Sequence, residues 1–101
     1  MIKIALDAMG GDHAPLEIIK GALLAVKDYP VHVVLVGQEP IIQGYLDRLC
    51  KGKCPDTISI QHASEIVEMS ESPLQSFKKK KDSSIAIGIT MLNEGHVQGF
   101  V

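Results

Sequence analysis

Apolar residues in this chain switch between two periods, and that rhythm limits the fold more than any other feature. Short apolar or alternating stretches predict strands, and stretches with apolar residues at every third or fourth position predict helices. The predicted order is a strand at residues 2–7, a helix at 15–29, a strand at 31–36, a helix from 40 to the Lys51-Gly52-Lys53 turn, and a strand at 57–61. Strands joined by single helices of this length form right-handed crossovers and a parallel sheet. We therefore predict an α/β fold with three layers, α/β/α, around a mainly parallel sheet.

The last part of the chain predicts one more helix and one more strand. Asp82, Ser83 and Ser84 are residue types that cap helices, and an apolar pattern of helical spacing follows them. A strand is then expected from residue 97 to residue 101, where the sequence ends. We interpret residues 1–101 as the N-terminal portion of a single α/β domain, truncated within its fourth strand.

A glycine-containing loop at residues 7–15 joins the first predicted strand to the first predicted helix. Gly10 and Gly11 leave no side chain between the backbone and a ligand. The helix that begins at Pro15 presents free N–H groups with a partial positive charge. This order of strand, glycines and helix start predicts an anion-binding loop, although Gly-Gly-Asp is also ordinary turn chemistry.

Three ionisable residues accompany the glycines. Asp7 ends the first predicted strand, and the carboxyl end of a parallel strand is where α/β sheets build their sites. Asp12 and His13 add a second carboxylate and a group that titrates near neutral pH. We take these three as the candidate catalytic residues, with a capping carboxylate and a surface imidazole as the alternative interpretation.

Four consecutive lysines, residues 78–81, precede the last predicted helix. Such a run is most often the solvated end of a helix, stabilised by the helix dipole. The alternative is a second anion site, in which Lys80 and Lys81 fold back over a helix start that is capped by Ser83 and Ser84.

Composition excludes several classes of function. The 10 Lys and Arg residues are balanced by 12 Asp and Glu residues, so nothing indicates a nucleic-acid binder. No apolar run approaches the roughly 20 residues of a membrane span, and no basic leader precedes the first strand, which predicts a cytoplasmic chain. The nucleotide-binding glycine fingerprints are missing, and we expect no cofactor.

Cys50 and Cys54 are the only cysteines. Together with His62 they offer three zinc ligands, but the regular second pair of a structural zinc site is missing. We predict no metal site and two reduced thiols near a helix end.

Three stretches, residues 1–15, 62–69 (His-Ala-Ser-Glu-Ile-Val-Glu-Met) and 80–84 (Lys-Lys-Asp-Ser-Ser), occur in an order that resembles the bacterial phosphate acyltransferases of the PlsX family. The resemblance implies an enzyme that transfers a fatty acyl group from acyl carrier protein to inorganic phosphate, giving the acyl phosphate used in phospholipid synthesis. It also implies a fold like that of isocitrate and isopropylmalate dehydrogenases or of phosphotransacetylase. Members of the family are considerably longer, so we expect these 101 residues alone to be inactive.

The resemblance also implies roles and partners. As a hypothesis, His13 donates a proton or a hydrogen bond at the reacting centre, and Asp12 or Asp7 orients it. The residues expected to bind phosphate or the oxyanion are Gly10, Gly11, Lys80, Lys81, Ser83 and Ser84. The implied partners are acyl carrier protein and inorganic phosphate, and the implied assembly is a homodimer at the inner surface of the membrane.

Other functions fit the same residues. The main alternative is a non-catalytic phosphate- or nucleotide-binding α/β module, and a third is an inactive fragment that matters only through assembly. A nicotinamide dehydrogenase fits less well, because Arg48 is the only arginine and such enzymes bind their substrates with an arginine cluster.

Overall fold

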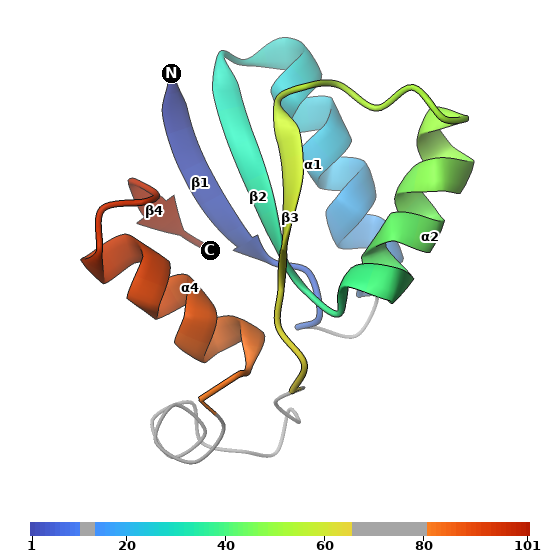
Figure 1. Ribbon diagram of the computed structural model, residues 1–101. Helices are drawn as coiled ribbons and strands as arrows, with labels where there is room; N and C mark the ends of the chain where they lie inside the picture. The colour runs from blue at the N-terminus through green and yellow to red at the C-terminus, as the bar shows by residue number, and fades with distance from the viewer. Residues whose placement is uncertain (11–13, 66–80) are drawn as a thin grey trace.

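Four parallel strands form the centre of the structure, a computed structural model that describes residues 1–10, 14–65 and 81–101 (Figure 1). The elements are β1 (Ile2–Asp7), α1 (Leu16–Asp28), β2 (Val31–Gly37), α2 (Glu39–Cys50), β3 (Ile58–His62), α4 (Ser84–Asn93) and β4 (Gly99–Phe100). The strand order is β3-β2-β1-β4, and every neighbouring pair is parallel. The predicted parallel α/β fold is confirmed, whereas its likeness to dehydrogenases or phosphotransacetylase stays a prediction.

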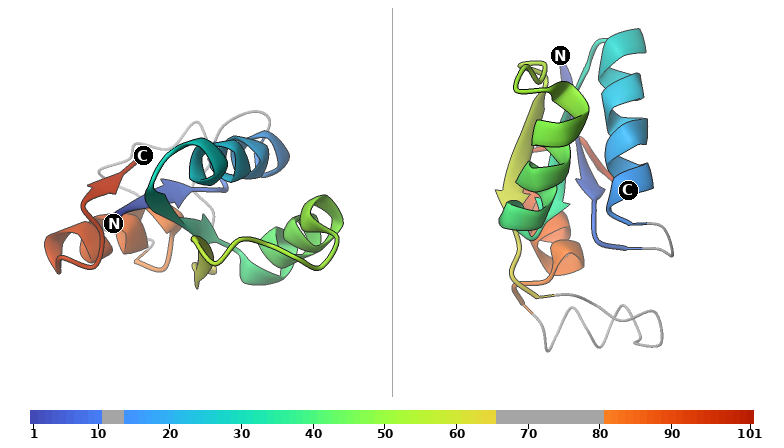
Figure 2. Two further views of the ribbon diagram at one scale, coloured as in Figure 1. Left: turned by 90° about the horizontal axis from the view of Figure 1, so that it is seen from above. Right: turned by 90° about the vertical axis from the view of Figure 1, so that its right-hand side faces the viewer.

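The central strand β2 is buried on both faces, as its β-branched sequence predicts. Successive side chains of a strand point to opposite faces. Val33 and Leu35 pack in the core cluster that includes residues of α1 and α2. Val34 and Val36 pack in a second cluster, which residues of α4 cover. Figure 2 shows the result, with α1 and α2 on one side of the sheet and α4 on the other.

The helix ends agree with the predicted ones to within a residue, whereas the predicted state of the two cysteines differs from the structure. Pro15 is the N-cap of α1, one residue before the helix begins. The C-cap of α2, Lys51, adopts a left-handed conformation, and Gly52 also has a positive φ. This turn brings the Cα atoms of Cys50 and Cys54 to 5.0 Å, and the two residues form a disulfide. The prediction of reduced thiols is therefore wrong.

Across the described ranges, no helix has both the length and the apolar character needed to cross a membrane.

Strand β4 anchors the carboxyl end of β1. Val101 donates its N–H to the carbonyl of Ala5 at 2.9 Å and accepts from the N–H of Asp7 at 3.0 Å. On the other side, the N–H of Ala8 donates to the carbonyl of Val36 at 2.9 Å. The backbone where the glycine loop begins is thus held by both neighbouring strands.

Two helical glycines predict opposite effects of the same substitution. A Cβ at Gly88 in α4 would collide with the Phe100 ring, whereas a Cβ at Gly21 in α1 has nothing within 4 Å. We expect Gly88→Ala to lower the free energy of unfolding by about 1–3 kcal/mol, the usual cost of overpacking. Gly21→Ala should raise it by about 0.5–1 kcal/mol, because alanine favours the helix. Thermal unfolding of the two variants checks this, and a stabilised Gly88→Ala would contradict the packing of α4 on β4.

Candidate functional site

The carboxyl ends of β1, β2 and β3 meet the start of α4 at one edge of the sheet (Figure 1). The register places Asp7 beside Val36, and Gly37 beside His62. Such an edge is the usual place for a binding site in a parallel α/β sheet. The described parts of two stretches predicted to bind anions, residues 7–10 and 81–84, therefore reach the same edge from opposite ends of the chain.

A hydrogen bond between side chains joins these two stretches. The Ser84 hydroxyl donates to Oδ1 of Asp7 at 2.6 Å, and the N–H of Met9 donates to the same oxygen at 2.9 Å. Ser84 is only 2% exposed, and Asp7 is half-buried. A Cβ at Gly10 would lie 2.9 Å from Oδ2 of Asp7, so the glycine allows the loop to pass close to the carboxylate. The aspartate is thereby held in one orientation by groups on both sides.

The neighbouring serine orders the start of α4. Ser83 is the N-cap, and its hydroxyl oxygen accepts from the N–H of Ala86 at 3.2 Å, as the sequence predicts. Ser83 is fully buried. Ser84 is also buried and is hydrogen bonded to Asp7. The Ser83 hydroxyl therefore orders the start of α4, and the Ser84 hydroxyl orients the Asp7 carboxylate.

Asp82 ties the start of α4 to the end of β3. Its Oδ2 accepts from the N–H of Ser64 at 2.9 Å and from the Ser64 hydroxyl. The N–H of Asp82 donates to the side chain of Glu65 at 3.0 Å, and the N–H of Glu65 donates to the Asp82 carbonyl at 3.0 Å. The hydrogen bonds from Ser64 hold the pKa of Asp82 below its ordinary value of 3.8, with a smaller contribution from His62.

His62 lies at the start of α2. Its Nδ1 accepts from the N–H of Glu39, the first residue of α2, at 3.1 Å. Cys50 ends the same helix of 12 residues, which is about 18 Å long at 1.5 Å per residue. The histidine and the disulfide therefore lie at opposite ends of α2, and no group of three His, Cys, Asp or Glu side chains gathers within residues 1–10, 14–65 and 81–101.

Of the residues predicted for the site, the structure brings together Asp7, Gly10, Ser83 and Ser84. Lys81 is exposed, two residues before the N-cap of α4. The other predicted site residues, Gly11, Asp12, His13 and Lys80, lie outside the described residues. Their roles stay predictions.

Sequence reasoning missed the pairing of Ser64 with Asp82. Residues 62–72 carry no periodic pattern, so nothing in them indicates a partner, and Asp82 resembles a third capping residue beside Ser83. One signal in the sequence could have revealed this contact, namely that Asp82 is not needed as a cap when Ser83 is present. A helix start needs one N-cap side chain, so an acidic residue next to a serine cap is free to bind another segment.

Comparisons with known proteins agree with the sequence motifs. Residues 2–101 match the protein family described as "Fatty acid synthesis protein". The chain is 45% identical over 101 residues to a phosphate acyltransferase of Desulfitobacterium hafniense (strain Y51), and 50% identical over 95 residues to one of Desulforamulus reducens. These matches cover 100% and 94% of this chain but only 29% and 28% of the relatives. The chain thus spans less than a third of the length of either protein.

The pairing of Ser64 with Asp82 predicts a pH effect with a definite sign. Because the pKa of Asp82 is lowered in the folded state, this group stabilises the fold above pH 3.8, and the contribution is lost as pH falls through the lowered pKa. Ser64→Ala should move the pKa back toward 3.8, as followed by carboxyl carbon chemical shifts in a pH titration. Ser59→Ala, within β3, should leave it in place, and an equal response to both variants would refute the assignment.

Proposed function

This chain belongs to the fatty acid synthesis protein family, and on that premise we propose that it supplies part of the active site of a phosphate acyltransferase. The reaction transfers a fatty acyl group from a thioester on acyl carrier protein to inorganic phosphate. The names of the relatives support the reaction, and the shared edge of the sheet supports its location. Because the relatives are more than three times longer, the activity belongs to a protein that also carries their remaining portion.

The observation that carries the proposal is the hydrogen bond from Ser84 to Asp7. It joins a glycine loop that precedes one helix, α1, to the start of another, α4. Free N–H groups at two helix starts favour negative charge, and the reaction has two anionic species to hold. These species are the phosphate nucleophile and the oxyanion that develops on the carbonyl.

In the proposed reaction, a phosphate oxygen attacks the thioester carbon and the carbonyl becomes a tetrahedral oxyanion. When the carbonyl reforms, the C–S bond breaks, and His13 gives its proton to the departing sulfur. Asp7 or Asp12 orients the imidazole, and N–H groups at Gly10 and Gly11 stabilise the oxyanion. Phosphate is an anion at neutral pH, so it needs positioning more than activation.

We divide the predicted lysine and serine ligands of phosphate into two groups. Lys80 and Lys81 provide positive charge for direct contact, and Lys81 is exposed as this role requires. Ser83 and Ser84 are buried, and we assign them to positioning, Ser83 through the α4 start and Ser84 through Asp7.

Acyl carrier protein and phosphate are the proposed partners. Acyl carrier protein is acidic, so the lysines at 78–81 would attract it at long range. We extend the proposal to a homodimer that associates with the membrane surface, in line with the family resemblance.

Replacing His13 tests the reaction. A suitable protein is a chimera in which this chain replaces the matching segment of the Desulfitobacterium hafniense phosphate acyltransferase. We expect His13→Ala to lower kcat by about 10²–10⁴-fold, the usual contribution of a general acid. Acyl phosphate is measured by trapping with hydroxylamine, and circular dichroism checks the fold. Near-normal kcat in a folded variant would remove His13 from the mechanism, and a folded parent chimera without acyl transfer would favour the phosphate-binding module.

The coupling of Ser84 to Asp7 predicts non-additive effects in the same chimera. Ser84→Ala should lower kcat by about tenfold, since it removes one charge-assisted hydrogen bond. Asp7→Ala should lower it further, and the double variant should be no worse than Asp7→Ala alone. Gln43→Ala, on the exposed face of α2, is the matched control. Additive losses would show that Ser84 does not act through Asp7.

A further inference from the structure

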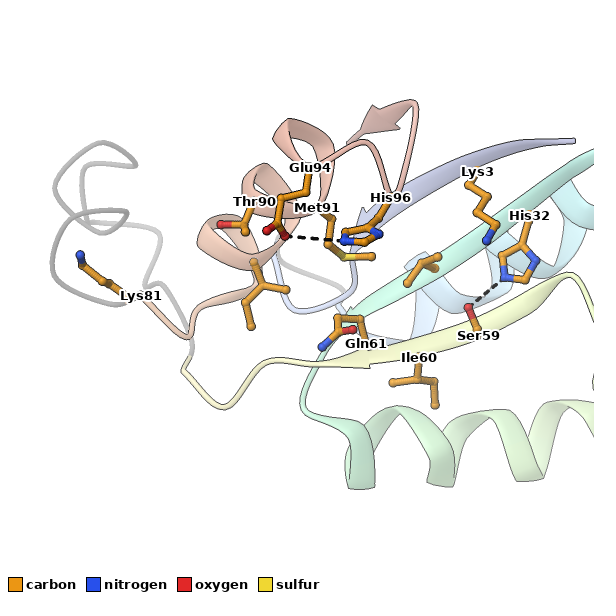
Figure 3. A pocket seen from close by; sticks show the side chains of 12 residues that line it. Lys3, His32, Ser59, Ile60, Gln61, Lys81, Thr90, Met91, Glu94 and His96 are labelled. Carbon is orange, nitrogen blue, oxygen red and sulfur yellow. Dashed lines mark hydrogen bonds and ion pairs between the residues drawn. The ribbon is translucent and has the colours of Figure 1, made fainter.

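A groove of about 600 Å³ lies between α4 and β3, on the face of the sheet that α4 only partly covers (Figure 3). The cause is the strand order. Helix α4 packs on β1, β2 and β4, and it has no comparable contact with β3 among the described elements. The edge strand β3 therefore leaves part of its α4-facing surface open.

The lining of the groove is mixed in chemistry. Its apolar residues are Ile87 and Met91 of α4, Val34 of β2 and Ile60 of β3. Its uncharged polar residues on the two walls are Thr90 of α4 and Ser59 and Gln61 of β3. A saturated acyl chain would leave the polar groups of this lining without hydrogen-bond partners. A chain with alternating methylene and amide groups packs on the apolar residues and hydrogen bonds to the polar ones.

The two ends of the groove carry positive charge. Lys81 lines the end beside the start of α4, where Ser84 holds Asp7. Lys3 lines the other end, next to His32, which is hydrogen bonded to Ser59 at 2.9 Å (Figure 3). Glu94 also lines the groove, and its carboxylate lies 3.7 Å from Nε2 of His96.

The position of Lys3 along β1 gives the direction of the groove. Lys3 and Asp7 are four residues apart on one strand, so their side chains point to the same face and lie about 13 Å apart along it. A ligand that meets Lys3 with an anionic group and follows the groove toward the carboxyl edge reaches the level of Asp7.

We propose that this groove binds the pantetheine-type arm of the thioester substrate, with the arm's phosphate at Lys3 and its amides between β3 and α4. The thioester then lies at the edge where Ser84 and Asp7 meet. This inference rests on the proposed function, since it supplies the path by which an acyl thioester reaches that edge. It assigns the groove to the arm and leaves the acyl chain outside it.

Small thioesters of increasing length test the arm separately from any docking of acyl carrier protein. The substrates are the acyl thioesters of N-acetylcysteamine, of pantetheine and of pantetheine 4′-phosphate, assayed in the chimera with the Desulfitobacterium hafniense enzyme. Thr90 is exposed on α4 and lines the groove. Thr90→Trp should raise KM about tenfold for both pantetheine thioesters and leave the N-acetylcysteamine thioester unchanged. Gln43→Trp, on the exposed face of α2, is the matched control.

The role of Lys3 is tested by the preference of the enzyme for the phosphorylated arm. Lys3→Glu should abolish the preference for pantetheine 4′-phosphate over pantetheine, a loss of about tenfold, while KM for the unphosphorylated arm stays constant. Lys53→Glu, in the loop after α2, should keep the preference. If all three thioesters respond equally to Thr90→Trp, or if Lys3→Glu leaves the preference intact, the arm does not occupy this groove.

Failure of the proposed function gives a different pattern. In that case no thioester yields acyl phosphate in a folded parent chimera. The arm proposal is then decided by binding, with pantetheine 4′-phosphate as the probe and amide chemical shifts as the readout. Shifts confined to Lys3, Ser59, Gln61 and α4 support the groove as a pantetheine site, and unchanged shifts there overturn it.

Discussion

The burial of β2 on both faces is the constraint on which the rest of the structure depends. A strand with Val33 and Leu35 on one face and Val34 and Val36 on the other needs cover on both sides. Helices α1 and α2 cover one face because right-handed crossovers carry the chain in one direction across the sheet. The chain then returns past β1 to form β4, and the same handedness places α4 on the opposite face (Figure 2).

This reversal of direction creates the candidate site. Helices on opposite faces of the sheet meet at the carboxyl end of β1, because α1 follows β1 in the chain and α4 begins beside it, and such a point is the usual ligand position in α/β sheets. Asp7 lies there, between the backbones of β2 and β4, and accepts a hydrogen bond from the Ser84 hydroxyl on the α4 side of the sheet. Residues 77 positions apart in the chain thus become hydrogen-bond partners. The Ser64 to Asp82 contact adds a second tie between β3 and the start of α4, at the same edge.

The groove beside α4 follows from the same topology. Because α4 lies over β1 and β2, the α4-facing side of β3 stays open, and its residues there are Ser59 and Gln61 instead of aliphatic residues. A polar wall on an edge strand is also a common way to keep a sheet edge from aggregating. The lysines at the two ends of the groove, Lys3 and Lys81, are the feature on which we propose a ligand path there.

The sequence by itself determined the elements, because apolar periodicity and capping residues act over a few neighbours in the chain. The parallel sheet and a helix cap at residues 82–84 were predicted on that basis, and Ser83 is the residue that forms the cap. Only the tertiary structure decided which loops meet, since the partner of Asp7 is a serine that no local pattern connects to it. The same holds for the Cys50 to Cys54 disulfide, which depends on the left-handed turn at Lys51, and for the Ser64 to Asp82 contact. Long-range pairing depends on how whole strands and helices pack, and that information is spread over the entire core.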